Sequence, residues 1–179
     1  MKKIAVLSHK SGNIGHNFMS MGVEIILDAM FGDKMQIEHF EQHHPFDVYS
    51  NFHPLRLLHY LPYGRFDFLR NYIARSDVYK KLWRTSRRLD FDLAIACGGP
   101  NIIRGASQVA EMKLLLLHMN GAFQYHGIPF VDAAVGACFP FEDQEILFKT
   151  EDDRIFYRQA IKYVSEITVR EKVASKVVE

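Results

Sequence analysis

Short apolar runs alternate with helical patterns along the chain, and this alternation limits the fold more than any other feature of the sequence. Compact apolar runs that stop at turn-rich segments are typical of strands buried on both faces. The predicted strands lie within residues 3–8, 35–40, 90–100, 128–136 and 166–170. Strands that alternate with helices predict an α/β fold, here a Rossmann-like, mostly parallel sheet with helices on both faces.

Helical spacing marks segments between these runs. Residues 108–127 are apolar on most sides, which predicts a long buried helix. Residues 151–164 predict an amphipathic helix, and its first turn carries acids, as the helix dipole favours. The first helix is predicted to end at Gly32, and its apolar residues fall three or four apart: Phe18, Met21, Ile25 and Ala29.

A single domain spanning residues 1–179 is predicted, because a chain of this length buries one sizeable core. Residues 41–88 depart from the alternation. Their first part is rich in His, Pro and aromatics, which predicts an excursion over the mouth of the sheet, followed by helical material. Residues 170–179 open a helix directly after the last strand. We therefore expect the N-terminal half of a larger two-domain protein, with a short packed C-terminal helix as the alternative.

Composition excludes several classes of function. A formal charge of +1 gives no reason to expect nucleic acid as a partner. Cys97 and Cys138 lie in apolar contexts, which favours a reducing compartment over a disulfide framework. The apolar run near the N-terminus is too short for a secretory signal, and no run approaches membrane-spanning length. We expect a cytoplasmic protein with no transmembrane segment.

The loop after the first strand, "HKSGNIGHN", is the first candidate site, because ligands of parallel sheets bind at the carboxyl ends of strands. Gly12 and Gly15 fit neither G-x-G-x-x-G nor G-x-x-x-x-G-K-[ST], which disfavours a dinucleotide or a P-loop nucleotide. Backbone N–H groups at the start of the next helix favour an anion or a hydroxyl, and Asn13, His16 and Asn17 add donors and acceptors. In the alternative, Asn13 and Asn17 are only turn and cap residues.

The carboxyl end of the third strand is the second candidate site. Gly98 and Gly99 follow this strand directly and let a backbone approach a ligand closely. Arg104 comes next on the loop, where its guanidinium can pair with a carboxylate or a phosphate. The alternative is a tight turn that needs glycine for its conformation alone.

Histidines and a cysteine invite two further interpretations. His39, His43 and His44 have a metal-like spacing, but an i, i+4 pair suits a metal only on a helix, and Pro45 disfavours a continuous helix there. No metal site is predicted. Cys97 is predicted to be a small buried hydrophobe, because no charged neighbour suggests a lowered pKa.

Four stretches, in order, resemble the polysaccharide pyruvyl transferase family. "SGNIGHNFMSMG" is similar to the family's opening strand–loop–helix, G-N-x-G followed by Asp or Asn, and departs from it at His16. "FDLAIACGGPNIIRG" is similar to the family's D-x-x-(apolar)-x-G-G segment, and "GIPFVDAAVGACFPF" to the strand and loop that follow. "SEITVREKVASKVV" is similar to its strand–Val-Arg–Glu–x–x–Ser element. The likeness covers most of the chain except about 41–88.

The resemblance implies one half of a glycosyltransferase-B-type protein, in which two Rossmann-like domains face across a cleft. The implied activity transfers a pyruvyl group from phosphoenolpyruvate to two hydroxyls of a carbohydrate acceptor, with no cofactor. The family's phosphoenolpyruvate-holding residues lie largely in the second domain, so a second domain or subunit is expected to complete the cleft. The expected roles are His16 as catalytic residue and, for substrate binding, Asn13, Gly15, Asn17, Gly98, Gly99 and Arg104.

Two other functions stay open at this stage. A glycosyltransferase-like domain that uses a nucleotide sugar fits the same fold. A domain that binds a ligand or partner without turnover fits the lack of a donor half within 179 residues. Binding of a nucleotide sugar, rather than phosphoenolpyruvate, by an intact two-domain form would favour the first of these.

Overall fold

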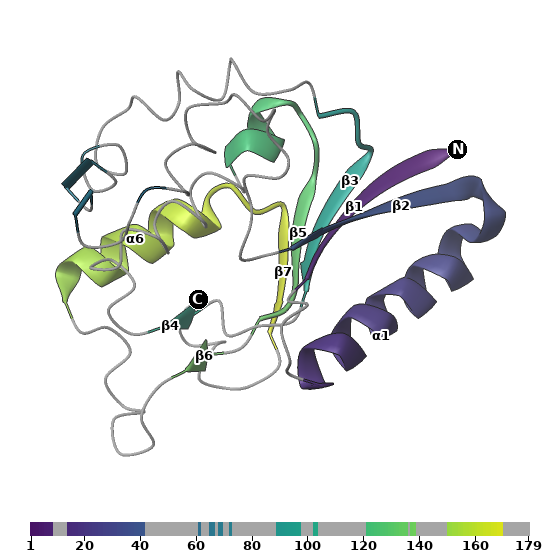
Figure 1. Ribbon diagram of the computed structural model, residues 1–179, viewed down its shortest axis with the longest axis horizontal. Coiled ribbons are helices and arrows are strands. Elements are labelled where there is room, and N and C mark those ends of the chain that lie inside the picture. Colours follow the sequence, from purple (N-terminus) through teal and green to yellow (C-terminus); the bar gives the residue numbers. More distant parts are fainter. Residues whose placement is uncertain are drawn as a thin grey trace.

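Five parallel strands form the centre of the computed structural model, in the order β2-β1-β3-β5-β7 (Figure 1). Every strand pair of this sheet is parallel. The strand bounds are β1 Lys2–Ser8, β2 Met35–Glu41, β3 Leu93–Cys97, β5 Phe130–Val135 and β7 Glu166–Val169. All five predicted strands are confirmed, and the sheet with its helices is a Rossmann-like α/β fold.

The structure describes a defined part of the chain: residues 1–8, 14–41, 61, 65–66, 68–69, 72, 89–97, 102–103, 121–135, 137–138 and 150–169. Most of the predicted excursion at 41–88 therefore lies outside the described residues. The predicted C-terminal helix in 170–179 lies outside them as well. Both expectations stay predictions.

Strand β1 is an inner strand of the sheet and has a partner on each side. Its residues from Ile4 to Ser8 are buried, and it pairs with β2 on one edge and with β3 on the other. At its exposed start, the backbone N–H of Lys3 donates to Asp92 Oδ2 at 2.9 Å, and Lys2 Nζ contacts Asp92 Oδ1 at the same distance. These hydrogen bonds lower the pKa of the Asp92 carboxyl. They connect β1 to the turn that leads into β3.

Helices cover the two faces of the sheet in different ways. Helix α1 (Ile14–Phe31) lies on one face, and α6 (Glu151–Ile161) lies on the other with the short helix 121–125 (Figure 1). Side chains alternate between the faces along each strand. On the α1 face Ile4 and Val6 therefore pack with Leu27, whereas Ala5 and Leu7 belong to the core on the opposite face.

Helix α1 confirms the predicted helix, but the residues that showed the helical period lie on its outer side. Phe18, Met21 and Ile25 are exposed, whereas Leu27 is buried against the sheet. The helix ends at Phe31, and Gly32 follows with a φ of 51°, a left-handed conformation that glycine adopts without strain. The predicted end at Gly32 is confirmed. No helix within the described residues has the length and apolar character needed to span a membrane.

The core opposite α1 is built around a pair of aromatic rings. Phe123 of helix 121–125 is fully buried and stacks on Phe130 of β5, with ring centroids 5.6 Å apart. Gly127 then turns the chain with a φ of 70° between this helix and β5. Only this last part of the predicted helix at 108–127 lies within the described residues.

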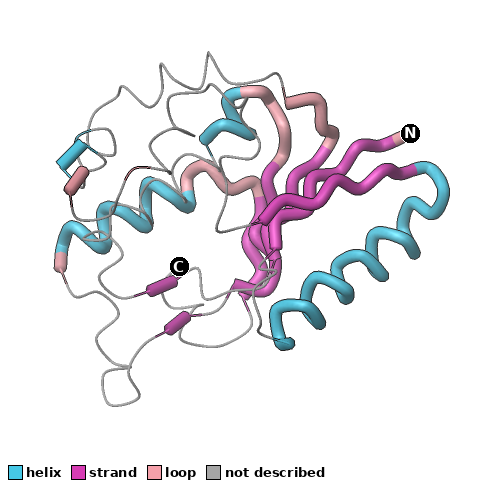
Figure 2. The backbone as a smooth tube through the Cα atoms, viewed as in Figure 1, coloured by secondary structure: helices cyan, strands magenta, loops and turns pink. Residues whose placement is uncertain are grey.

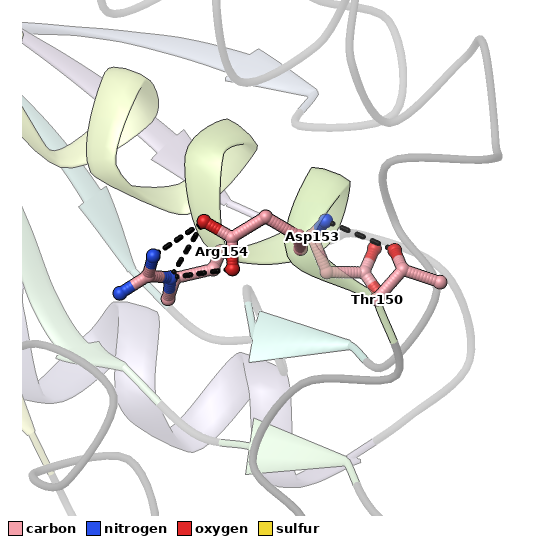
Figure 3. A network of polar contacts seen from close by, with 4 residues as sticks. Thr150, Asp153 and Arg154 are labelled. Carbon is pink, nitrogen blue, oxygen red and sulfur yellow. Dashed lines mark hydrogen bonds and ion pairs between the residues drawn. The ribbon is translucent and has the colours of Figure 1, made fainter.

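Helix α6 begins at a side-chain cap (Figure 3). The Thr150 hydroxyl accepts a hydrogen bond from the backbone N–H of Asp153 at 3.2 Å, which satisfies a donor that the first helical turn leaves unpaired. Arg154 contacts the Glu151 carboxylate one turn away. The predicted helix in this region is confirmed, and its buried side contributes Phe156 to the fold.

We expect the Phe123→Ala variant to lose about 3–5 kcal/mol of unfolding free energy, because it removes a buried ring that has a stacking partner. Urea titration followed by circular dichroism measures this loss. The matched control is Tyr125→Ala in the same helix, where the side chain is 48% exposed and the expected loss is below about 1 kcal/mol. Equal losses in the two variants would contradict the described packing.

Candidate functional site

The strand order reverses between β1 and β3. From β1 the chain moves to β2 at one edge of the sheet, and it then returns to β3 and continues toward β7 at the other edge. In doubly wound sheets, ligands bind outside the carboxyl ends of the strands at such a point. Ser8 and Cys97, the last residues of β1 and β3, are paired neighbours there. The first and second candidate loops of the sequence therefore start side by side.

A second, smaller sheet lies beyond the carboxyl ends of β3 and β5. Strand β4 (Ile102–Ile103) pairs with β6 (Ala137–Cys138) in parallel (Figure 2). These strands follow β3 and β5 closely in the sequence, so their pairing holds together the segments that leave two neighbouring strands. Gly98 and Gly99 lie between β3 and β4 in the sequence, and Arg104 directly follows β4, but all three are outside the described residues.

The first turn of α1 holds three of the predicted site residues: Gly15, His16 and Asn17. Asn13 lies just before the helix, outside the described residues. The backbone N–H groups of a first turn are not bonded within the helix and give this end a partial positive charge. No acidic side chain occurs in this first turn to offset that charge. The start of α1 is therefore a favourable place for an anion.

The three residues do not share one face of the helix. Consecutive helical residues are separated by about 100° around the axis. His16 is half-buried, and its Nδ1 atom is shielded from solvent, whereas Gly15 and Asn17 are exposed. The backbones of these three residues therefore lie together in the first turn, as the predicted grouping around one ligand requires. The His16 side chain, however, lies on the side of the helix that faces the sheet, apart from the other two.

Polar side chains continue from His16 along the inner side of α1. The Ser20 hydroxyl donates to Glu24 Oε1 at 3.3 Å, and the same Glu24 oxygen lies 4.0 Å from His39 Nε2 on β2. Ser20 also hydrogen-bonds the Cys97 thiol. We call the residues that occupy this region the polar cluster: Ser8, His16, Ser20, Glu24, His39, Glu41 and Cys97.

The polar cluster lies only at one end of the interface between α1 and the sheet. Toward the amino ends of the strands, this interface is apolar and includes Ile4, Leu27 and Ile95. Toward the carboxyl ends, Ser8 pairs with both Glu41 and Cys97 in the strand register, and Glu41 Oε1 is buried. Carboxylates and imidazoles are the side chains that most often move protons in active sites. This polar end coincides with the strand-order reversal.

The Cys97 thiol is not the reactive group of this cluster. Burial raises its pKa to about 11, although the hydrogen bond with Ser20 acts in the opposite direction. The thiol is therefore protonated near neutral pH, and a protonated thiol is a poor nucleophile. The prediction of a small buried residue at this position is confirmed.

The carboxyl end of β5 has an unusual backbone. Ala134 has a φ of 58°, in the left-handed region that costs a non-glycine residue on the order of 1 kcal/mol. The pairing of β5 with β7 is irregular between Asp132 and Val135, and the Ala134 N–H donates to Thr168 Oγ1 at 2.8 Å. The edge strand thus fixes the direction in which β5 leaves the sheet, toward β6.

Sequence reasoning missed most of the polar cluster, although two signals pointed to it. His16, Ser20 and Glu24 recur every four residues, so they share one side of α1. His39 and Glu41 alternate along β2 and share its α1 face. Among the described residues, no group of three or more His, Cys, Asp or Glu side chains is arranged to hold a metal ion. His43 and His44 lie outside these residues.

We expect Cys97 to resist alkylation in the folded chain. A rise in pKa from 9.0 to about 11 lowers the thiolate fraction at pH 8 by about 100-fold, and burial also restricts access. A Cys138→Ser chain isolates this thiol, and mass spectrometry then follows its reaction with iodoacetamide. The same chain in urea is the control and should react at the rate of a free cysteine. Equal rates in the folded and unfolded chains would contradict the assigned burial.

Comparisons with known proteins add no relative to this picture. No protein-family model matches the chain, and searches of curated proteins and of solved structures return no match either. Any function assigned to the chain therefore depends on its own residues and geometry. The strongest of these observations is the polar cluster. It lies at the carboxyl ends of the strands, where the strand order reverses, next to the N-terminus of α1.

Proposed function

We propose that the chain is a pyruvyl transferase-like domain that binds a carbohydrate acceptor and contributes to the transfer of a pyruvyl group from phosphoenolpyruvate. The observation that carries the proposal is the position of three strand ends. The carboxyl ends of β1, β3 and β5, each followed by a stretch that resembles the family, lie together on the same side of the sheet. These are the ends whose loops resemble the transferase family. Their adjacency supports a shared site.

The reaction joins the pyruvyl carbon to two acceptor hydroxyls as a ketal, protonates the methylene carbon of phosphoenolpyruvate to a methyl group and releases phosphate. It requires a base for the acceptor hydroxyl, an acid for the methylene carbon, and positive groups for the carboxylate and phosphate. We assign the base role to His16, which lies at the polar end of the α1 interface. The α1 N-terminus supplies a partial positive charge nearby. In the proposal, Arg104 adds a full positive charge, and Gly98 and Gly99 form the backbone wall of the site.

A second domain or subunit belongs to this proposal. The chain's own contribution is then acceptor binding, the base and the anion contact of Arg104, and most of the donor-binding cations come from the other half of the cleft. The chain alone should bind ligand without turning it over. Turnover is expected only when both halves are present.

Nuclear magnetic resonance titration of the 15N-labelled chain tests the site directly. Phosphoenolpyruvate and a panel of acidic and neutral oligosaccharides are the probes. We expect the amide signals of Gly15, His16 and Cys97 to shift, because they lie at the edge where strand order reverses. We expect His16→Ala to weaken oligosaccharide binding about tenfold or more, equivalent to one lost hydrogen bond to a charged or buried group.

The matched control is His126→Ala, which changes a half-buried histidine on the turn after helix 121–125. This variant should bind like the unmodified chain. A nucleotide sugar that shifts the same amides while oligosaccharides and phosphoenolpyruvate do not would favour a glycosyltransferase-like domain. Absence of pyruvyl transfer by every form that carries both halves would contradict the proposal.

A further inference from the structure

The outer side of α1 carries a continuous line of large apolar side chains. Each is more than half exposed, and each lies on the side of the helix opposite Leu27. We call this line the apolar stripe; it consists of Ile14 (71% exposed), Phe18 (65%), Met21 (55%) and Ile25 (66%). The spacing of four, three and four residues is the spacing of the contact seam between two packed helices.

Small residues border the stripe on one side. Gly15, Gly22 and Ala29 recur every seven residues, so they form a second line beside it. A Cβ atom added at Gly22 would meet nothing within 4 Å, and Gly22 does not adopt a positive φ. Glycine inside a helix is destabilising compared with alanine. Nothing within the described residues requires glycine at position 22, but close approach of another helix would.

We propose that two copies of this chain associate through α1, with the two helices antiparallel about a twofold axis. The axis passes between Phe18 and Met21. Phe18 then packs against Met21 of the second copy, and Ile14 packs against Ile25. A twofold contact uses the same surface on both copies, so one self-complementary stripe is sufficient. This inference concerns the outer side of α1. The proposed function uses the inner side of α1 and its N-terminus, and Asp28 of the second copy would lie beside that N-terminus.

The distribution of charge on α1 favours a second copy of this chain as the partner of the apolar stripe. Asp28 continues the line of the stripe beyond Ile25. In the antiparallel arrangement, its carboxylate lies next to the N-terminus of α1 in the second copy, whose partial positive charge has no acidic side chain in the first turn to offset it. Helix α1 contains no Lys or Arg. A helix that binds lipid surfaces normally carries such cations beside its apolar face, so a membrane is the less suitable partner.

The available area fits a reversible dimer. The four side chains of the stripe on each copy would together remove on the order of 1,000 Å² from water, which is near the lower bound for a specific interface. Ile26, which is 60% exposed, lies on the flank of the small residues and widens the apolar surface. We therefore expect a monomer–dimer equilibrium that depends on concentration.

Sedimentation equilibrium of the chain over a range of concentrations tests the proposal. The mass should rise from 20.8 kDa toward twice that value. Phe18→Glu and Met21→Lys should each weaken association by more than about tenfold, because each places an unpaired charge in the contact. An equimolar mixture of the two variants should recover association, since the introduced carboxylate and ammonium then face each other across the axis.

Ile155→Glu is the matched control, because Ile155 is an exposed apolar residue on α6, away from α1. This variant should associate like the unmodified chain. Gly22→Leu separates association from folding. It should raise the thermal midpoint of the monomer, since leucine favours the helix and an added Cβ atom meets nothing within 4 Å, and it should weaken the dimer.

Two results would overturn the proposal. One is a chain that stays monomeric at all concentrations, whether or not it binds anionic phospholipid vesicles through the stripe. The other is a dimer that is unaffected by Phe18→Glu and by Gly22→Leu while both variants remain folded by circular dichroism. Recovery of association in the mixture of Phe18→Glu and Met21→Lys chains supports the antiparallel register, and failure to recover contradicts it.

Discussion

The hydrogen bonding of β1 on both of its edges is the constraint on which the rest of the structure depends. Because β1 pairs with β2 and with β3, it fixes the point at which the strand order reverses. Because it is buried on both faces, it also takes part in both cores. The chain leaves β1 toward α1, so the same strand sets where that helix begins relative to the carboxyl edge. The position of the candidate site therefore depends on this strand.

The two faces of the sheet differ in chemistry as well as in the elements that cover them. The face opposite α1 is closed by aromatic packing, such as Phe40 against Phe91 and Phe123 against Phe130. The α1 face changes from apolar to polar along the strands and ends in Glu41 and Cys97. Buried polar groups are normally hydrogen-bonded, and Ser20 provides such a bond to Glu24 at this end of the interface.

Most of the sheet was predictable from the sequence, because a parallel strand buried on both faces is a compact apolar run such as that of β1. The side of α1 that faces the sheet was not. This helix has apolar residues on two sides, and a period shows which residues share a side but not which side is buried. The period that includes Phe18 and Met21 marks the exposed side of the helix.

The candidate site was predictable to the extent that it follows from topology. The rule for parallel sheets placed it at the strand ends, and the structure puts the ends of β1 and β3 side by side. The contact of Glu24 with His39 was not accessible, because it joins residues from two elements whose relative position only the fold defines. Roles for Gly98, Gly99 and Arg104 remain predictions from the sequence.

The two-sided character of α1 has a consequence for how this segment tolerates change. Insertion or deletion of one residue within the helix would rotate all later residues by about 100°. Such a change between Met21 and Val23 would turn Leu27 out of the core and, at the same time, move Ile25 out of the apolar stripe. A point substitution alters only one side of α1. A change in the number of residues between Ile14 and Phe31 alters both the side that faces the sheet and the outer side. Length variation should therefore be far less tolerated in α1 than substitution on either side.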